Sequence, residues 1–383
     1  MSDAKMSDAK MSDTFTFQPM LTCIGNKRKL IPHIHEIADQ IKTRLQKPRL
    51  TIMDAFTGSG VVIRGLIDLC DRVYTNDLEK YAHLMSRCFL ETPSAAAQSR
   101  IAHHIERMNQ FAESGPYKLD GPISRLYAPQ NTEDIKVGER CFYTRENALI
   151  IDTLRQYVAD AVEPELVPYL LVPLLVKASI HTNTAGVFKG FYKDGEVGCF
   201  GGKARNALSR ILKPIRVEMP VWTTQQLESV QCFCGDSNQV IRDQAPKDID
   251  IIYLDPPYNQ HPYGSNYFML NVIIDNQEPT ALSRVSGIPT NWNKSNYNSR
   301  KTAIAAMRDL LADSLAKAKY VVLSYNNEGI IEEADWAQIF EPYVVEKREI
   351  EYDTFKGSRN LQDRSDKVME IMYIISAKPA VVP

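Results

Sequence analysis

The sequence is poor in cysteine, and the few cysteines that it has are not arranged as a metal site. The seven cysteines are odd in number and scattered, and no two of them form a Cys-x-x-Cys pair. Such pairs mark structural zinc sites, and even sets at short spacings mark disulfide frameworks. Cys232 and Cys234 alternate with Phe233, as residues of a strand do. We therefore expect no metal and no disulfide framework.

Long apolar runs and a strong charge of one sign are also absent. No stretch approaches the roughly 18 apolar residues of a membrane helix. The N-terminus lacks the charged start and the apolar core of a signal peptide. The formal net charge of -2 argues neither for nor against nucleic acid, because binding depends on where the charge is placed. The expectation is a cytoplasmic protein without membrane association.

A length of 383 residues suits one large α/β domain with an insertion, or two domains. Residues 1–14 repeat a short polar unit and are predicted to be a disordered tail or an expression remnant. Strands alternating with helices predict a parallel, Rossmann-like sheet that is covered on both faces. These strands are expected at 49–56, 71–77, 229–236, 248–257 and 319–327.

Two segments depart from this alternation. The last two strand patterns, "VVEKREIEY" and "KVMEIMYIISA", have no helix between them and predict a closing antiparallel hairpin. Residues 91–228 interrupt the rhythm with helical stretches at 145–162 and 165–180 and with a glycine-rich basic region. We expect residues 15–90 and 229–383 to form a catalytic domain, into which 91–228 is inserted as a mainly helical domain that faces the substrate.

A turn with two glycines follows the first strand. It runs from Asp54 through Phe56 and Gly58 to Gly60, and glycines let a backbone approach a ligand closely at the start of a helix. The dinucleotide fingerprint has a third glycine in register, which this turn lacks. The second strand ends in Asp77, about twenty residues on, where an acidic residue meets ribose hydroxyls. A nucleotide-like ligand is indicated, although Asp77 alone also suits a helix N-cap.

Two more segments carry groups that could bind a ligand. Asp236 ends the third strand near the same edge of the sheet, where its carboxylate could contact an adenine's exocyclic amine or cap a loop. The lysines of "GNKRKLIPHI" (25–34) could hold a carboxylate, although this segment on its own is typical of a solvated helix start.

The most specific signal is "LDPPY", which ends the strand expected at 248–257. The two prolines stop the strand and stiffen the turn. An exocyclic amine on adenine is a poor nucleophile, because its lone pair is delocalised into the ring. The Asp255 carboxylate and the Pro256 carbonyl could accept its hydrogens and expose that lone pair. Tyr258 could stack on the face of a base that has been taken out of the duplex.

Together these motifs resemble a known family. Asp-Pro-Pro-Tyr, Phe-Thr-Gly-Ser-Gly, Asn-Asp-Leu and Gly-Asn-Lys-Arg-Lys-Leu occur here as they do in the Dam-like, S-adenosylmethionine-dependent adenine-N6 DNA methyltransferases. The resemblance covers most of the chain from Phe15 to about Ala377. It implies a site-specific enzyme that methylates a flipped adenine in double-stranded DNA. Whether a cognate restriction endonuclease is a functional partner is left open by the sequence.

The resemblance also implies roles for particular residues. Asp255, Pro256, Pro257 and Tyr258 would form the catalytic motif. The cofactor S-adenosylmethionine would be bound by Lys27, Asp54, Phe56, Gly58, Gly60, Asp77, Asp236 and Asp255. Lys27 matches the family lysine that reaches the carboxylate of the methionine moiety. Family members often have an aromatic residue four positions before that lysine, where this chain has Cys23.

A basic cluster in the insertion is the expected DNA face. It interleaves lysine and arginine with aromatic residues and glycines between Lys177 and Arg216, opposed within that range only by Asp194 and Glu196. Most of these charges would contact phosphates, and Arg205 and Asn206 could read base edges. The candidates are Lys189, Lys193, Lys203, Arg205, Asn206 and Arg210. The alternative surface is "GIPTNWNKSNYNSRK" (287–301).

Three other functions remain open at the level of sequence. Cytosine-N4 or RNA amino-methylation uses related chemistry, although cytosine-specific relatives usually have serine where this chain has Asp255. A dinucleotide-dependent oxidoreductase would leave Asp-Pro-Pro-Tyr unexplained. A non-catalytic DNA-binding protein with a relict cofactor fold is disfavoured by the intact Asp255 and Tyr258. The sequence gives neither the recognition site nor the oligomeric state.

Overall fold

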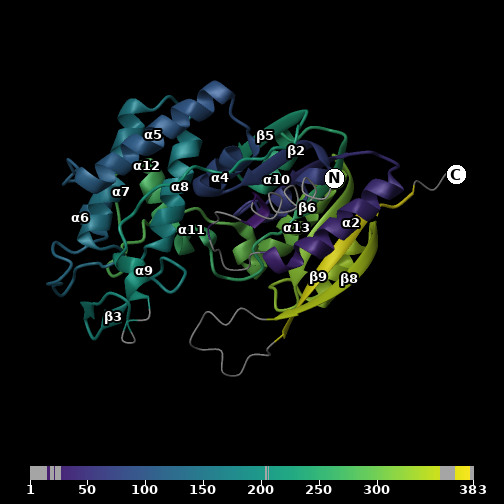
Figure 1. The fold of residues 1–383 in the computed structure, drawn as a ribbon. Coiled ribbons are helices and arrows are strands. Elements are labelled where there is room, and N and C mark those ends of the chain that lie inside the picture. The colour runs from purple at the N-terminus through teal and green to yellow at the C-terminus, as the bar shows by residue number, and fades with distance from the viewer. Residues whose placement is uncertain are drawn as a thin grey trace.

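The computed structural model describes residues 15–17, 21, 27–202, 205, 207–353 and 367–379. Its centre is a seven-stranded sheet with the order β5-β2-β1-β6-β7-β9-β8 (Figure 1). The strands are β1 (Leu50–Asp54), β2 (Cys70–Asp77), β5 (Ser229–Cys234), β6 (Ile249–Leu254), β7 (Ala318–Asn326), β8 (Tyr343–Asp353) and β9 (Lys367–Ala377). The predicted tail 1–14 lies outside the described residues.

The pairing of the strands confirms the predicted fold class. β5, β2, β1, β6 and β7 run parallel to one another. β9 pairs with β7 and β8 pairs with β9 in antiparallel register, which is the closing hairpin expected from the two final strand patterns. Every residue of β1 and of β6 is buried, as the unbroken apolar runs of strands covered on both faces require.

Helices cover both faces of the sheet, and the side chains of neighbouring strand residues enter two separate cores. Val322 packs with Ile34 and Met372 on the face covered by α2, α3 and α4. Leu323, the next residue, packs with Leu310 on the face covered by α10, α13 and α14. The helices are α2 (Ile31–Arg44), α3 (Val61–Gly65), α4 (Lys80–Leu90), α10 (Ser237–Asp243), α13 (Arg300–Leu315) and α14 (Glu333–Phe340), with the 3-10 turns η1 (Arg28–Leu30), η2 (Ile67–Leu69) and η3 (Asn296–Asn298).

The segment between α4 and β5 is mainly helical, as predicted for residues 91–228, and its helices gather beside one end of the sheet (Figure 1). The two helical stretches predicted at 145–162 and 165–180 are α7 and α8. The elements are α5 (Ala95–Ser114), α6 (Pro122–Leu126), α7 (Arg145–Ala161), α8 (Val167–Ile180), β3 (Lys193–Asp194), β4 (Val197–Gly198) and α9 (Leu208–Leu212). That these residues form a separate domain stays a prediction.

Two helices after β6 join the sheet to this helical segment. α11 (Tyr263–Asn266) and α12 (Phe268–Asp275) follow the Asp-Pro-Pro-Tyr turn. The apolar side chains of α12 and of α8 belong to one core together with those of α4 and α7. None of the helices in the described ranges is long and apolar enough to cross a membrane.

Candidate active site

The carboxyl ends of β1, β2, β5 and β6 meet at one edge of the sheet and surround a pocket. Because these strands are parallel, the acidic residues that follow each of them come together there. The pocket encloses about 1150 Å³, including its open mouth. Nine of the residues predicted to bind or react line it: Lys27, Phe56, Gly58, Asp77, Asp236, Asp255, Pro256, Pro257 and Tyr258. Asp54 and Gly60 are not among its lining residues.

The glycine turn is bound to the end of β2. The Gly58 N–H donates to Oδ2 of Asp77 at 2.7 Å, and the Thr57 hydroxyl donates to the Asn76 carbonyl at 2.9 Å. Gly58 and Gly60 have φ values of +53° and +77°, a conformation that strains any residue with a Cβ. Gly60 is therefore needed to turn the chain into α3, although it does not touch the pocket.

Asp54 lies beneath this turn with one of its oxygens unused. Its Oδ1 accepts the Phe56 N–H at 3.3 Å. Its Oδ2 is buried and has no hydrogen-bond partner among the described residues. Burial raises the pKa of Asp54 well above its usual value. A buried carboxylate oxygen without a donor is costly, so a donor on a bound molecule would stabilise it.

Asp77 and Asp236 each combine a structural role with a place in the pocket. Both oxygens of Asp77 accept backbone hydrogens, from Gly58 and, at 2.9 Å, from Glu79. Burial raises the pKa of Asp77. Asp236 is the N-cap of α10, where its carboxylate accepts the Gln239 N–H at 3.2 Å. Asp236 is thus a cap, whereas the N-cap of α4 is Glu79 and not Asp77. Both carboxylates line the pocket.

The Asp-Pro-Pro-Tyr turn places Asp255 opposite a buried lysine. Lys27 Nζ lies 3.0 Å from Asp255 Oδ1, and the lysine is only 4% exposed, so Lys27 itself is not solvated, whereas Lys29 at the start of the helical segment is exposed. Burial raises the pKa of Asp255 to about 6, although Lys27 lowers it. The Tyr258 ring meets the Tyr325 ring edge to face, with centroids 6.3 Å apart. A rigid acid and an aromatic ring therefore share one wall of the pocket.

Two groups in or beside this wall were missed by the sequence reasoning. The first is Glu370 on β9, whose Oε1 lies 3.0 Å from Lys27 Nζ. The second is Glu79, which accepts hydrogens from the side-chain amides of Asn271 at 2.6 Å and Asn293 at 3.3 Å. Burial raises the pKa of Glu79 to about 7. Only Glu370 gave a signal in the sequence, as an acid in an otherwise apolar strand.

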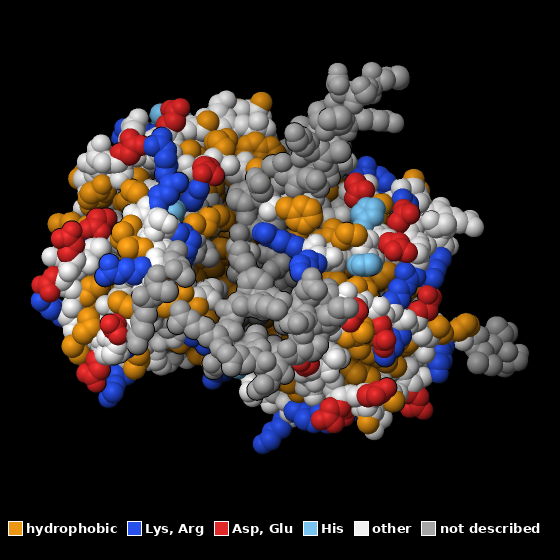
Figure 2. Space-filling model, turned by 60° about the horizontal axis from the view of Figure 1, so that its bottom comes forward, with side chains coloured by type: hydrophobic (Ala, Val, Ile, Leu, Met, Phe, Trp, Pro, Cys, Tyr) orange, Lys and Arg blue, Asp and Glu red, His pale blue; other side chains and the backbone are white. Residues whose placement is uncertain are grey.

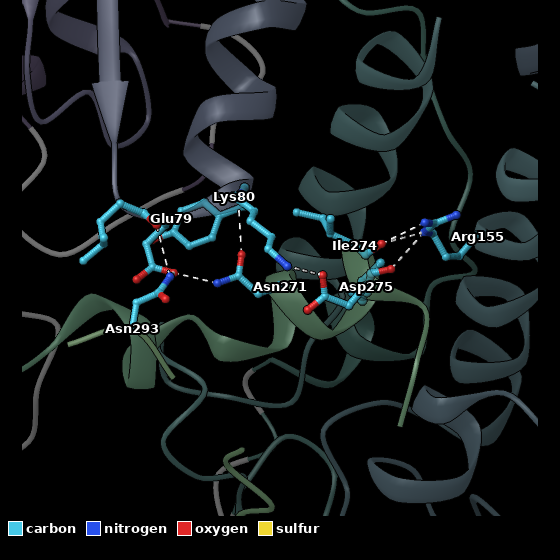
Figure 3. Close-up of polar contacts among 10 residues, drawn as sticks. Glu79, Lys80, Arg155, Asn271, Ile274, Asp275 and Asn293 are labelled. Carbon is cyan, nitrogen blue, oxygen red and sulfur yellow. Dashed lines mark hydrogen bonds and ion pairs between the residues drawn. The ribbon is translucent and has the colours of Figure 1, made fainter. Parts of the chain in front are cut away.

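Figure 3 shows how Glu79 ties the pocket to α12. Glu79 and Lys80 start α4, and they reach Asn271 and Asp275 on α12. Asn271 also accepts the Tyr81 N–H, so it completes the first turn of α4 from another helix. On the far side, Arg155 of α7 donates to the carbonyl oxygens at the end of α12. A chain of polar contacts thus runs from the pocket to the inserted helices.

Residues 293–298 close the pocket on the side of α10. This segment belongs to the stretch proposed from sequence as the alternative recognition surface. The Tyr297 hydroxyl donates to Asn238 at 2.6 Å, and its ring meets the Phe56 ring edge to face at 5.5 Å. The Asn298 amide donates to the Asn259 carbonyl at 2.7 Å, directly after the catalytic turn. These residues form a wall around the ligand space.

Some of the predicted DNA-contacting residues have exposed charged groups, and another already uses its charged group in hydrogen bonds within the protein. Lys189, Lys193 and Arg205 are exposed. The Arg210 guanidinium instead donates to the carbonyl oxygens of Ile180 and Thr182, so it holds the end of α8. Lys203 and Asn206 lie outside the described residues, as does Cys23.

Acidic residues from elsewhere in the chain also neutralise part of the wider basic cluster. Lys177 pairs with Glu218, and Arg216 pairs with Glu113, both from outside the cluster's range. On the face drawn in Figure 2, the basic side chains of the described residues lie interspersed with acidic ones. Of the charges in the cluster, those of the exposed Lys189, Lys193 and Arg205 are therefore the better candidates for phosphate contacts.

Comparison with known proteins agrees with this geometry. Type II methyltransferase M.NlaIII of Neisseria lactamica is 26% identical over 84% of this chain and 89% of its own length. Type II methyltransferase M.CviAII of Paramecium bursaria Chlorella virus 1 is 25% identical over 84% of this chain and 87% of its own. Modification methylase StsI of Streptococcus sanguinis is 25% identical over 93% of this chain, which spans only 52% of that protein.

A solved structure is also similar, but distantly. It is a putative RNA methyltransferase from Pyrococcus horikoshii, with a TM-score of 0.34 and 8% identity over 98% of this chain, too little to bear on function. The sequence model of a whole family, by contrast, matches residues 24–339, which include the glycine turn, Asp77, Asp236 and the Asp-Pro-Pro-Tyr turn. The chain belongs to the D12 class of N6 adenine-specific DNA methyltransferases.

Proposed function

We propose that the pocket binds S-adenosylmethionine and that Asp255 to Tyr258 present a flipped adenine to it. The observation that carries this proposal is that the glycine turn, Asp77 and the Asp-Pro-Pro-Tyr turn line one continuous pocket. The donor set fits the cofactor. Among the lining residues, Asp77 suits its ribose hydroxyls and Lys27 suits its carboxylate. Asp54 lies beneath the glycine turn, so we assign it no contact with the cofactor. When bound, the cofactor supplies an electrophilic methyl group on a sulfonium sulfur.

The protein's own residues prepare the amine for this methyl group. Asp255 accepts a hydrogen bond from N6, as does the Pro256 carbonyl, so the nitrogen lone pair is freed from the ring. With the cofactor held by Asp77 and Lys27, it would supply its methyl group to N6, and the electron pair of the S–C bond would remain on sulfur. The proton that N6 loses passes to the Asp255 carboxylate, whose pKa of about 6 leaves it ionised at neutral pH. Tyr258 holds the base by stacking.

The relatives' names favour a modification enzyme. Several are modification methylases or Type II methyltransferases. We therefore infer that this enzyme works in the cytoplasm, on double-stranded DNA, and protects a site that a cognate restriction endonuclease cuts. The family match favours adenine N6 over the cytosine-N4, RNA and oxidoreductase alternatives, and an enzyme over a relict fold.

Transfer of a labelled methyl group to unmethylated DNA tests this function. After incubation with S-adenosylmethionine, the DNA is digested and its nucleosides are separated. We expect the label in N6-methyl-2′-deoxyadenosine alone. Label in N4-methyl-2′-deoxycytidine, or transfer to RNA but not to DNA, would contradict the proposal. Sequencing that detects modified bases would then give the recognition site.

A further inference from the structure

One ammonium group in the pocket wall is shared by two carboxylates. Lys27 Nζ lies 3.0 Å from Asp255 and 3.0 Å from Glu370. Glu370 is 1% exposed, and it comes from the far end of the chain. Burying a carboxylate is costly unless it is well paired, so a second acid beside the catalytic one calls for a reason.

The direction of β9 explains how Glu370 reaches the site. Because β9 is antiparallel to β7, its first residues lie where β7 ends, at the edge that holds the pocket, and Glu370 pairs with Asn326. Ser324 pairs with Met372, two residues beyond Glu370, so Ser324 and Glu370 share one face of the sheet. The Ser324 hydroxyl donates to Oε1 of Glu370. Ser324 and Lys27 thus both contact the same oxygen of Glu370, its Oε1.

This arrangement has an electrostatic consequence for the catalytic acid. If Lys27 had no other partner, its ammonium group would neutralise Asp255 and weaken it as a hydrogen-bond and proton acceptor. Glu370 acts against this in two ways. It attracts the same ammonium group, and its own negative charge favours the protonated form of Asp255.

We propose that Glu370 is a positioning residue for methyl transfer, which holds the Lys27 ammonium between two carboxylates so that Asp255 keeps its strength as an acceptor. This inference rests on the proposed catalytic role of Asp255. It assigns Glu370 no contact with the base or the cofactor.

Other ionisable groups face Asp255 and have to be considered before a pH profile is interpreted. They are Lys27, Glu370, Asp54, Tyr253 and Tyr258. Burial lowers the pKa of Lys27, but Asp255 and Glu370 raise it by more, so this lysine stays charged. Burial raises the pKa of Tyr253 well above its usual value. Asp54 is unchanged in every variant described below, so differences between variants report the change at Glu370.

The test is the pH profile of the single-turnover methyl-transfer rate for Glu370→Gln. The matched control is Glu349→Gln on the neighbouring β8, a glutamate that is 52% exposed. In Glu370→Gln, Lys27 is left to Asp255 alone, so Asp255 stays ionised to lower pH. We expect the acid limb of the pH–rate profile to move to lower pH by roughly half a pH unit or more. The maximal rate should fall by up to about a hundredfold, the cost of a misplacement near 1 Å.

The other outcomes also decide the question. If Glu370→Gln folds with a lowered Tm but has the rate and the acid limb of the Glu349→Gln control, Glu370 is only structural and the inference is wrong. If Glu370→Gln does not fold, Ser324→Ala replaces it, because that change keeps the charge but removes the donor that orients Glu370. A lowered rate in Ser324→Ala supports the inference, and a wild-type rate overturns it. Asp255→Ala is measured alongside; if it stays active, the proposed catalytic assignment itself has failed.

Discussion

At the scale of single residues, the Asp77 carboxylate combines contacts that hold the fold with a place in the pocket wall. It anchors the glycine turn through Gly58 and the start of α4 through Glu79, and it also lines the pocket. The N-cap of α4 is Glu79, so Asp77 is not the helix cap that its position allowed, and its contact with the Glu79 N–H leaves it in the pocket wall. The structure also explains why Asp54 and Gly60 matter without lining the pocket: one lies beneath the turn, and the other gives the turn its shape.

Asp77→Ala should weaken S-adenosylmethionine binding without changing DNA affinity in the absence of cofactor. A charge-assisted contact to ribose hydroxyls is worth roughly 1.5–3 kcal/mol. Isothermal calorimetry measures the cofactor's Kd. A thermal melt measures the stability that is lost when Asp77 no longer accepts hydrogen bonds from Gly58 and Glu79. The exposed Asp243, changed to Ala, is the control. Unchanged cofactor affinity in Asp77→Ala would leave this residue with its structural role alone.

At the scale of elements, the segments around the Asp-Pro-Pro-Tyr turn are closely packed. The wall formed by Glu79, Gly264 and Asn293 joins α4, α11 and the loop before η3. A Cβ added at Gly264 would lie 2.6 Å from the Asn293 carbonyl oxygen and 3.0 Å from Glu79 Oε1. Because backbone lies on one side and a buried carboxylate on the other, the added methyl group could be accommodated only if the wall shifted.

Gly264→Ala is therefore expected to destabilise the protein by about 1–3 kcal/mol, the usual cost of overpacking. It should also weaken cofactor binding, because the pocket wall has to shift. Gly190→Ala is the matched control, since a Cβ there meets nothing within 4 Å. Thermal melts with and without S-adenosylmethionine give both quantities. Equal melting temperatures for the two variants would show that this wall is looser than the structure indicates.

Much of this element order could be predicted from the sequence, and the reason is physical. Strands buried on both faces, such as β1 and β6, are short unbroken apolar runs, and helices between them keep their own periodicity. The parallel order then places Asp77, Asp236 and Asp255 at one edge. The burial of Lys27 could not be predicted, because its partner Glu370 is distant in sequence and reaches it only through the antiparallel β9.

At the scale of the whole molecule, the question is where DNA lies. Charge counted along the sequence overstates the basic cluster, because the acids that pair with Lys177 and Arg216 come from other parts of the chain. Arg210 likewise satisfies backbone carbonyls at the end of α8. Of the predicted DNA contacts in the basic cluster, the exposed charges of Lys189, Lys193 and Arg205 remain.

Replacing Lys189, Lys193 and Arg205 together by glutamine should weaken binding to every DNA sequence and flatten its salt dependence. Each lost phosphate contact lowers the slope of log Kd against log salt by about 0.9. Replacing Lys177 and Arg216 instead should change the slope less, because each already has an acidic partner. Fluorescence anisotropy over a salt series measures both. If the triple variant binds like the wild type, residues 287–301 become the better candidate for the DNA surface.

The most direct test of the whole account is the methyl-transfer rate of Asp255→Ala under single-turnover conditions. Asp243→Ala, an exposed acid at the end of α10, is measured as the control. With DNA and S-adenosylmethionine saturating and folding verified by thermal melts, the account predicts a loss on the order of 10²–10³-fold for Asp255→Ala. The control should keep the wild-type rate. A folded Asp255→Ala protein that methylates adenine at the control's rate would contradict the account.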